Sequence, residues 1–478
     1  MSRDAIGRDS PAQAIFFDLE TTDLHPIGQI LNFCFIAVDA NLQPVETFKG
    51  DIKISRLQLP RAGAILANRV DVREHQERAE YTENQAVFAI REFLVRHIAS
   101  SKAKVPLVGF NSAGFDLDYL RTVFIRNGVS PYLNFVSRDL LLLAQHLLLV
   151  SASFRKTVLT PRDDGEKTNI KLERLCQLHQ LLDGQQLHES EHDVLLTIEL
   201  AKVFRNTYDV DICQFEPYAV KALHKAKRGQ VFNLIEPLVR GATLEKYRRV
   251  TPSVLIEADE RYALWVNVEK FLETKDPEPA SATCVRFMKY AANVVMWEEA
   301  SSPEAKFAAC GDAIFQKYKG LTVSRYFTER ERGMVLQDLE QHIYRLTPQQ
   351  IDGLGRAIHQ GEEQLLRNNY QRQIWRRYFL ENWQPDLGNE QEFRRGFSRY
   401  VDYRYGGKML LEMVPEGTER AEKPQKFHPT IAELFTELDE RMEQAKANSD
   451  SPSIRLLESL HAFYDASEVC AVSKEAVP

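Results

Sequence analysis

The chain has 478 residues, of which 44% are hydrophobic and 27% are charged, so it offers ordinary globular material for two or three domains. Its net charge of −7 excludes a polycation, so any contact with nucleic acid must come from a local basic surface. The six cysteines form no Cys-x-x-Cys pair and no apolar block is long enough to span a bilayer. The sequence therefore predicts a protein of the reducing cytoplasm, with no zinc knuckle and no membrane partner.

Apolar periodicity divides the chain into strands and helices. It predicts strands at 14–18, 31–39, 45–54 and 105–110, and helices at 83–97, 115–126, 139–150, 170–182 and 193–204. Strands first, then strands alternating with helices, favour a mixed α/β sheet. After a linker at 209–218, short strands at 254–257 and 263–268 indicate a hairpin, and beyond residue 303 the chain is helical and charged. We therefore expect three domains, at 12–207, 215–300 and 301–470.

An acidic pair stands at the end of the first predicted strand. Because strand side chains alternate, Asp18 and Glu20 share one face while Leu19 points to the other. Two such charges about 4 Å apart repel by about 4 kcal/mol at an effective dielectric near 20. A hard divalent cation with oxygen ligands, Mg²⁺ or Mn²⁺, would remove this repulsion. The alternative is a strand end with two solvated acids, because Asp-x-Glu alone is a common pattern.

Two further motifs bring chemistry to the same sheet. A small-residue turn after the strand at 105–110 places Asp116 at a helix N-terminus, where an anion is tolerated, although a simple helix cap is the alternative. Asp193 begins the helix at 193–204, and His188 lies on the preceding loop, from which its imidazole can reach a carboxylate cluster. His192 is the rival histidine, but as the neighbour of Asp193 it should point away by about 100°. The nearby Glu189 and Glu191 are expected to be solvated.

The three motifs together resemble the DEDD-type 3′→5′ exonucleases of the histidine subtype. Their order and spacing match in Asp18-Leu19-Glu20-Thr21, in Asn111 with Phe115-Asp116, and in His188, Ser190 and Asp193. The segments 59–66, 138–141 and 171–175 are similar, more narrowly, to the bacterial exodeoxyribonuclease I family. The likeness is strong over residues 14–206, weak over 215–270, and not diagnostic beyond.

The resemblance implies a fold and a mechanism. The fold would be a ribonuclease-H-like mixed five-stranded sheet flanked by helices, followed by a small SH3-like β domain and a helical C-terminal domain. Asp18, Glu20 and Asp193 would hold one Mg²⁺, and Asp18 with Asp116 would hold a second about 3.5–4 Å away, with Mn²⁺ as a substitute. His188 would take the proton from the attacking water.

Candidate substrate-binding residues follow from the same resemblance. They are Thr21, Ile65, Leu66, Asn111, Phe115 and Lys171. Ile65, Leu66 and Phe115 could wedge or stack terminal bases, with core packing as the alternative. Two departures from the family concern the substrate rather than the metals. Residues 67–70 replace a Thr-Gly-Ile type sequence, and Lys171 replaces an arginine, which turns a bidentate phosphate fork into a point charge. A third departure is Asp23, which stands where relatives often have glycine.

The segment 364–408 combines arginines with aromatic residues. This composition is typical of single-strand binding, which uses a basic groove and aromatic platforms. The alternative is a pair of amphipathic helices whose aromatic residues form a core. The two interpretations are compatible if the aromatic residues face inward and the arginines face a nucleic-acid strand.

The sequence predicts a metal-dependent 3′→5′ exodeoxyribonuclease that releases nucleoside 5′-monophosphates from single-stranded DNA, with a role in DNA repair or recombination. One rival is the same active site acting on RNA or short oligonucleotides, which the 2′-hydroxyl would decide. A second is a noncatalytic nucleic-acid-binding subunit, and a third is a nuclease subunit of a larger defence or repair assembly. A single-stranded-DNA-binding protein as partner is implied by the resemblance alone.

Overall fold

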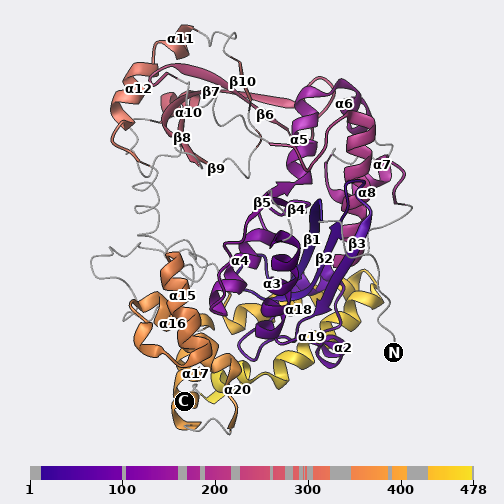
Figure 1. Cartoon of the computed structure of the whole chain (residues 1–478), viewed down its shortest axis with the longest axis vertical. Helices are drawn as coiled ribbons and strands as arrows, with labels where there is room; N and C mark the ends of the chain where they lie inside the picture. The colour runs from indigo at the N-terminus through magenta and orange to yellow at the C-terminus, as the bar shows by residue number, and fades with distance from the viewer. Residues whose placement is uncertain are drawn as a thin grey trace.

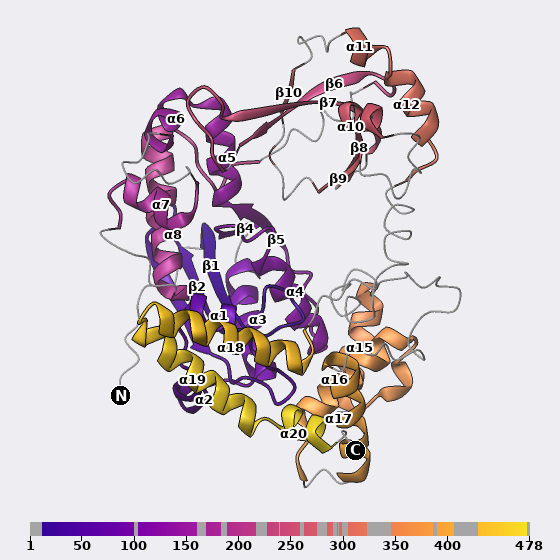
Figure 2. The ribbon, with the colours of Figure 1, turned by 180° about the vertical axis from the view of Figure 1, so that it is seen from behind.

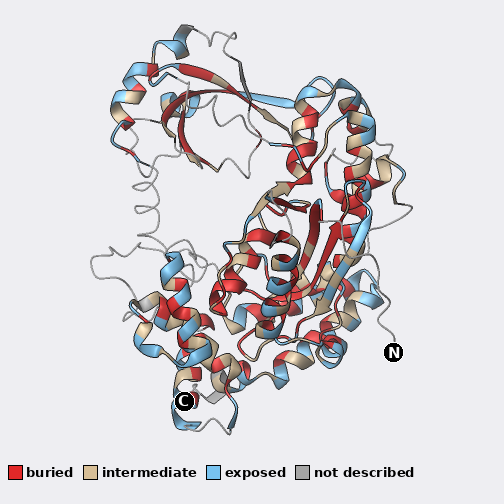
Figure 3. Ribbon diagram, in the orientation of Figure 1, coloured by how far each residue is buried: buried red, intermediate tan, exposed pale blue. Residues whose placement is uncertain are grey.

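The computed structural model contains two β-sheets and a helical C-terminal region (Figure 1). It describes residues 12–99, 104–159, 169–182, 189–216, 227–238, 240–258, 262–274, 284–289, 294, 296–298, 305–322, 346–385, 390–405 and 429–475. Figure 3 shows that buried residues line the central strands of both sheets and the inner faces of the surrounding helices, whereas the edge strand at residues 44–51 is exposed or partly exposed. Within the described residues, no helix is both long enough and apolar enough to cross a membrane.

The first sheet confirms the predicted mixed five-stranded architecture. Its strands are β1 (Ala14–Thr21), β2 (Ile30–Val38), β3 (Pro44–Asp51), β4 (Val105–Gly109) and β5 (Phe135–Asp139), in the order β3-β2-β1-β4-β5. The pairs β1–β2 and β2–β3 are antiparallel, whereas β1–β4 and β4–β5 are parallel. The carboxyl ends of β1, β4 and β5 therefore meet at one edge of the sheet, and this edge carries the acidic motifs.

Helices cover both faces of this sheet. One layer comprises α5 (Leu140–Val150), α6 (Ala152–Val158), α7 (Leu172–Leu178) and α8 (Ser190–Tyr208), and the other comprises α3 (Glu83–Ala99) and α4 (Asp116–Arg126). Ala14 and Phe16 of β1 pack into the α5–α8 layer. Phe17 and Leu19 pack into the α3–α4 layer. Because strand residues alternate, Asp18 and Glu20 face the α8 side.

The second sheet is antiparallel throughout, with the strand order β10-β6-β7-β8-β9. Its elements are β6 (Val231–Pro237), β7 (Arg248–Ala258), β8 (Tyr262–Asn267), α10 (Val268–Glu273), β9 (Val285–Lys289), β10 (Met296–Glu298), α11 (Ala305–Ala308) and α12 (Gly311–Tyr318). Ile314 and Tyr318 of α12 are fully buried against Val231, Val254 and Leu264 of the sheet. Helix α12 is therefore part of this β domain, although it follows residue 301.

The remaining helices bring the C-terminal region back to the first sheet. They are α15 (Pro348–Gln360), the 3₁₀ turn η3 (Glu363–Leu365), α16 (Asn369–Asn382), α17 (Glu390–Tyr405), α18 (Ile431–Ala447), α19 (Ser451–Ala466) and α20 (Glu468–Glu475). Figure 2 shows α18 and α19 lying along α1 (Ala62–Asn68) and α2 (Val72–Arg78). These four helices share one apolar core. The short helices α1 and α2, which were not predicted, are thus held by helices almost 400 residues further along the chain.

In the basic, aromatic segment 364–408 several aromatic residues are buried, whereas most of the described arginines are exposed. Trp383, Phe393 and Phe397 are buried in the core that α16 and α17 share with α18–α20, which is the packing alternative. Arg377 and Arg404 are also buried, so these two arginines do not face a nucleic-acid strand.

Candidate active site

Three carboxylates converge at the carboxyl edge of the first sheet. Asp18 and Glu20 end β1, and Asp193 lies in the first turn of α8. One oxygen from each lies within 4.8 Å of the others, which is the separation expected of ligands to a single ion. The position of Asp193 in a first helical turn also suits its charge, because the helix dipole is positive there.

Asp116 approaches the same cluster from the opposite helix layer. It is the first residue of α4 and only 4% exposed, and its carboxylate accepts a hydrogen bond from the main-chain N–H of Leu19. Leu19 lies between Asp18 and Glu20, so this hydrogen bond places Asp116 beside both. Asp116 is not among the three residues whose oxygens lie within 4.8 Å of one another.

The electrostatics of the cluster favour a bound cation. Burial, followed by the neighbouring charges of Asp193 and Asp116, raises the pKa of Glu20 to about 8. Burial raises the pKa of Asp116 to about 7. Burial and the charges of Asp116, Glu20 and Asp193 raise the pKa of Asp18 well above its usual value. Enclosed acids that repel one another bind either protons or a multivalent cation, so these residues fit a Mg²⁺ or Mn²⁺ site.

The predicted base His188 lies outside the described residues, so its position over the cluster stays a prediction. Its rival His192 is half-buried on α8, and its Nε2 atom is enclosed without a hydrogen-bond partner among the described residues. Glu189 is exposed, as expected. Glu191 is partly exposed and forms an ion pair with Lys49 of β3.

The predicted substrate-binding residues occupy different environments. Thr21 is buried, and its hydroxyl donates to the main-chain oxygen of Asp23 at 2.9 Å. Ile65 is fully buried in the core with the C-terminal helices, which is the packing alternative. Phe115 is half-buried, and its ring lies 5.1 Å from that of Tyr119. Asn111 and Lys171 are exposed, as a contact to a strand requires.

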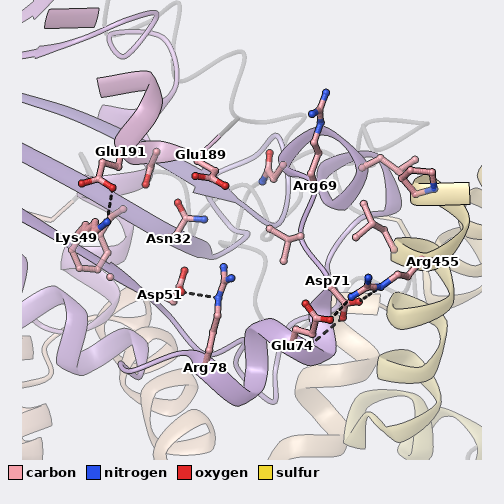
Figure 4. Close-up of a pocket in the computed structure, with 18 of the residues that line it drawn as sticks. Asn32, Lys49, Asp51, Arg69, Asp71, Glu74, Arg78, Glu189, Glu191 and Arg455 are labelled. Atoms are coloured by element: carbon pink, nitrogen blue, oxygen red, sulfur yellow. Dashed lines mark hydrogen bonds and ion pairs between the residues drawn. The ribbon is translucent and has the colours of Figure 1, made fainter. Parts of the chain in front are cut away.

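Leu66 lines a cavity of about 1100 Å³ (Figure 4), whose lining includes none of the four carboxylates but some of their neighbours. Asn32, the cross-strand partner of Glu20, and Ser190 of α8 also line it. Asn68 and Arg69, from the segment that departs from the family pattern, form a further part of its wall. Ion pairs such as Asp51 with Arg78 surround the opening, so much of the charge on its wall is already matched.

Sequence reasoning missed several residues around this site. Asn68 donates its side-chain amide to the main-chain oxygen of Thr21 at 2.9 Å, which ties α1 to the end of β1. Leu24, just beyond β1, is 73% exposed and offers an apolar surface to solvent four residues after Glu20. The exposed leucine could have been suspected from its place after the Asp-x-Glu motif, whereas no local pattern indicates the Asn68 contact.

Known proteins resemble this chain in part of its sequence and in its fold. No family model matches the chain. Exodeoxyribonuclease I of Escherichia coli (strain K12) is 26% identical over 197 residues, which span 40% of this chain and 39% of that protein. The sequence match thus covers well under half of the curated relative.

Solved structures extend the likeness to nearly the whole chain. A crystal structure of exonuclease I in complex with the inhibitor BCBP has a TM-score of 0.68 at 15% identity, covering 96% of this chain and 99% of that one. Escherichia coli exonuclease I in complex with a dA16 oligonucleotide has a TM-score of 0.61 at 16% identity, covering 94% and 98%. A moderately thermophilic exonuclease I from Methylocaldum szegediense has a TM-score of 0.60 at 15% identity, covering 96% and 99%.

The chain is similar to exodeoxyribonuclease I directly over part of its sequence, and in fold over almost all of its length. The resemblance predicted from the three motifs is confirmed at that level.

Proposed function

We propose that this protein is a metal-dependent 3′→5′ exonuclease that hydrolyses single-stranded DNA to nucleoside 5′-monophosphates. The observation that carries the proposal is the convergence of Asp18, Glu20 and Asp193 within 4.8 Å, with Asp116 hydrogen-bonded to the strand between them. Acids enclosed in this way repel one another and destabilise a protein unless a cation binds between them. Two-metal phosphoryl transfer is a chemistry that uses such acids as metal ligands.

Each acidic residue has a defined task in this proposal. Asp18, Glu20 and Asp193 hold one divalent cation, and Asp18 with Asp116 holds the second. When bound, the two cations supply electrostatic stabilisation to the entering and leaving oxygens of an in-line displacement at phosphorus. His188, on sequence grounds alone, accepts a proton from the attacking water on a ring nitrogen.

The substrate class is supported by the nature of the similar structures. Exonuclease I of Escherichia coli has been solved with dA16 and with dT13 oligonucleotides, and this chain shares that fold over 94% or more of its length. Single-stranded DNA is therefore the first substrate to test. A role in DNA repair, a cytoplasmic location and a single-stranded-DNA-binding protein as partner stay predictions.

One set of digestions tests the proposal. Purified protein is incubated with Mg²⁺ and labelled single-stranded DNA, double-stranded DNA or RNA, each with a free or a blocked 3′ end. We expect mononucleotides from single-stranded DNA with a free 3′ end, and none in EDTA. Asp18→Asn, prepared identically, controls for contaminating nucleases. Activity that survives in this variant, or that needs only a free 5′ end, would refute the assignment. Faster digestion of RNA than of DNA would mean that RNA is the preferred substrate.

A further inference from the structure

The carboxylate of Asp139 joins two segments at the edge of the first sheet. Asp139 is the last residue of β5 and is 5% exposed. Its Oδ1 accepts hydrogen bonds from the main-chain N–H groups of Asn111 at 2.8 Å and Leu141 at 2.9 Å. Its Oδ2 accepts a third from Ala113 at 2.9 Å. One buried side chain therefore caps α5 and also binds the turn that follows β4.

The hydrogen bonds within this turn are long, and a shorter one, from the Leu117 N–H to the Ser112 oxygen at 3.0 Å, ties the turn to α4. Asn111 has a φ of 63°, in the left-handed region that residues other than glycine adopt rarely. Within the turn, Gly114 donates to the oxygen of Asn111 at a long 3.3 Å, and Phe115 donates to that of Ser112 at 3.4 Å. The two N–H groups that Asp139 binds would otherwise be left without partners in a tight, partly buried segment. Asp139 thus holds the turn in its unusual conformation.

The turn leads directly to a proposed metal ligand. Only four residues separate Asn111 from Asp116, whose carboxylate accepts a hydrogen bond from the Leu19 main chain. Gly109 of β4 is in register with Asp139 of β5, so Asp139 lies beside the turn and on the same edge of the sheet as the carboxylates. A shift of the turn would move Asp116 relative to Asp18, because β1 is held in the sheet by its pairing with β2 and β4 and not by the turn itself.

We propose that Asp139 is a positioning residue for metal binding: it fixes the Asn111–Ala113 turn and thereby holds Asp116 in place to complete the second cation site. The inference rests on the proposed function. Residues that orient metal ligands in this indirect way typically change metal affinity by about 10–100-fold when replaced. The first site, formed by Asp18, Glu20 and Asp193, should be affected much less.

The test compares Asp139→Asn and Asp139→Ser with wild type. Asn keeps the volume but places an NH₂ group against a main-chain N–H. Ser still caps α5 but cannot bind the turn with a second oxygen. Asp118→Asn is the matched control, because it removes a partly exposed carboxylate from the same first turn of α4.

Three measurements are made on each protein: the Mg²⁺ concentration for half-maximal digestion of single-stranded DNA, Mn²⁺ titration without substrate, and amide hydrogen exchange. For both Asp139 variants we expect the Mg²⁺ concentration for half-maximal digestion to rise at least about tenfold. Binding of Mn²⁺ at the second cation site should be lost or weakened by a similar factor. Exchange should accelerate over residues 110–117 alone, and the KM for DNA should stay within about twofold. Asp118→Asn should behave as wild type.

The outcomes separate this inference from the proposed function. An unchanged Mg²⁺ requirement in folded Asp139→Ser, or a rate loss that equals the loss of folded protein, overturns the positioning role. If wild type digests nothing, the proposed function fails, but Mn²⁺ titration and exchange still decide whether Asp139 holds the second site. If Asp139→Asn does not fold, Asp139→Ser carries the test, because its α5 cap is retained.

Discussion

Replacing Glu20 with Gln should stabilise the metal-free protein at alkaline pH. The pKa of Glu20 rises from 4.5 to about 8, first because of burial and then because of the charges of Asp193 and Asp116. Between these pH values the folded protein binds more protons than the unfolded chain, so its free energy of unfolding falls as the pH rises. A shift of this size corresponds to about 4 kcal/mol at pH 8, where Glu20 of the folded protein is half ionised. Because the carboxylates share protons, this is an upper limit for one residue.

The amide of Gln has the same shape but carries no charge to bury. In EDTA at pH 8, Glu20→Gln should therefore unfold at a higher urea concentration than wild type, whereas at pH 5 the two should unfold nearly together. Adding Mg²⁺ should raise the midpoint of wild type by stabilising the folded state, and should affect the variant much less. The measurement is urea denaturation followed by fluorescence at both pH values, with and without Mg²⁺.

Exposed Glu92 of α3 provides the control, because Glu92→Gln removes the same charge away from the site. Its midpoint should follow that of wild type at both pH values. If Glu20→Gln is less stable than wild type at pH 8 in EDTA, the carboxylates do not repel one another as inferred. If Mg²⁺ stabilises the variant as much as wild type, the cation binds elsewhere.

Three other substitutions test separate parts of the structure. Asp116→Ala should leave folding intact, as judged by circular dichroism, and abolish Mg²⁺-dependent nucleotide release; a wild-type rate would contradict its role as a ligand. Arg69 ends α1 with a φ of 53°, so Arg69→Gly should relieve about 1 kcal/mol of backbone strain and raise the thermal midpoint. A lower midpoint would mean that the arginine side chain more than offsets the strain. Glu437→Ala removes two hydrogen bonds from Arg61, at 2.7 and 3.0 Å, and the acceptor for the Gly63 N–H at 3.1 Å. It should lower the free energy of unfolding, measured by urea denaturation, by about 2 kcal/mol. A loss below about 0.5 kcal/mol would show that solvent replaces the contact.

The sequence predicted how Asp18, Glu20 and Asp116 lie in their strand and helix, because local rules determine that geometry. Strand alternation was enough to put Asp18 and Glu20 on one face, and the structure places Phe17 and Leu19 in the opposite layer. The small-residue turn predicted a helix near Asp116, and α4 begins there. In each case the signal lies within a few residues of the side chain that it concerns, so tertiary packing had little opportunity to override it.

Features that depend on distant partners could not be predicted in the same way. Ile65 looked available to a nucleotide, but α18 and α19 cover it, and nothing near residue 65 indicates their approach. The role of Asp139 depends on main-chain N–H groups from another strand's turn, which carry no sequence signature. Helices α1 and α2 have only seven residues each, too few for a periodic pattern to stand out.

The buried arginines of the C-terminal helices alter the interpretation of that region. Glu83 of α3 accepts hydrogen bonds from Arg126 of α4, one of them at 2.7 Å, and also lies 4.0 Å from Arg377 of α16. Arg126 in turn donates to the main-chain oxygen of Gly28 at 2.8 Å, in the loop that follows β1. Charges this deeply buried are stable only when every partner is in place.

Helix α17 contacts the same loop through Arg404, which donates to the main-chain oxygen of Ile27 at 3.4 Å. The hydroxyl of the next residue, Tyr405, donates to the oxygen of Leu57 at 3.0 Å, in the segment between β3 and α1. The loop that leaves the Asp18–Glu20 strand is therefore held by α4 and α17 together. It follows that part of the arginine-rich segment stabilises the loop that leaves β1, and only its exposed arginines are available for the proposed contact with nucleic acid.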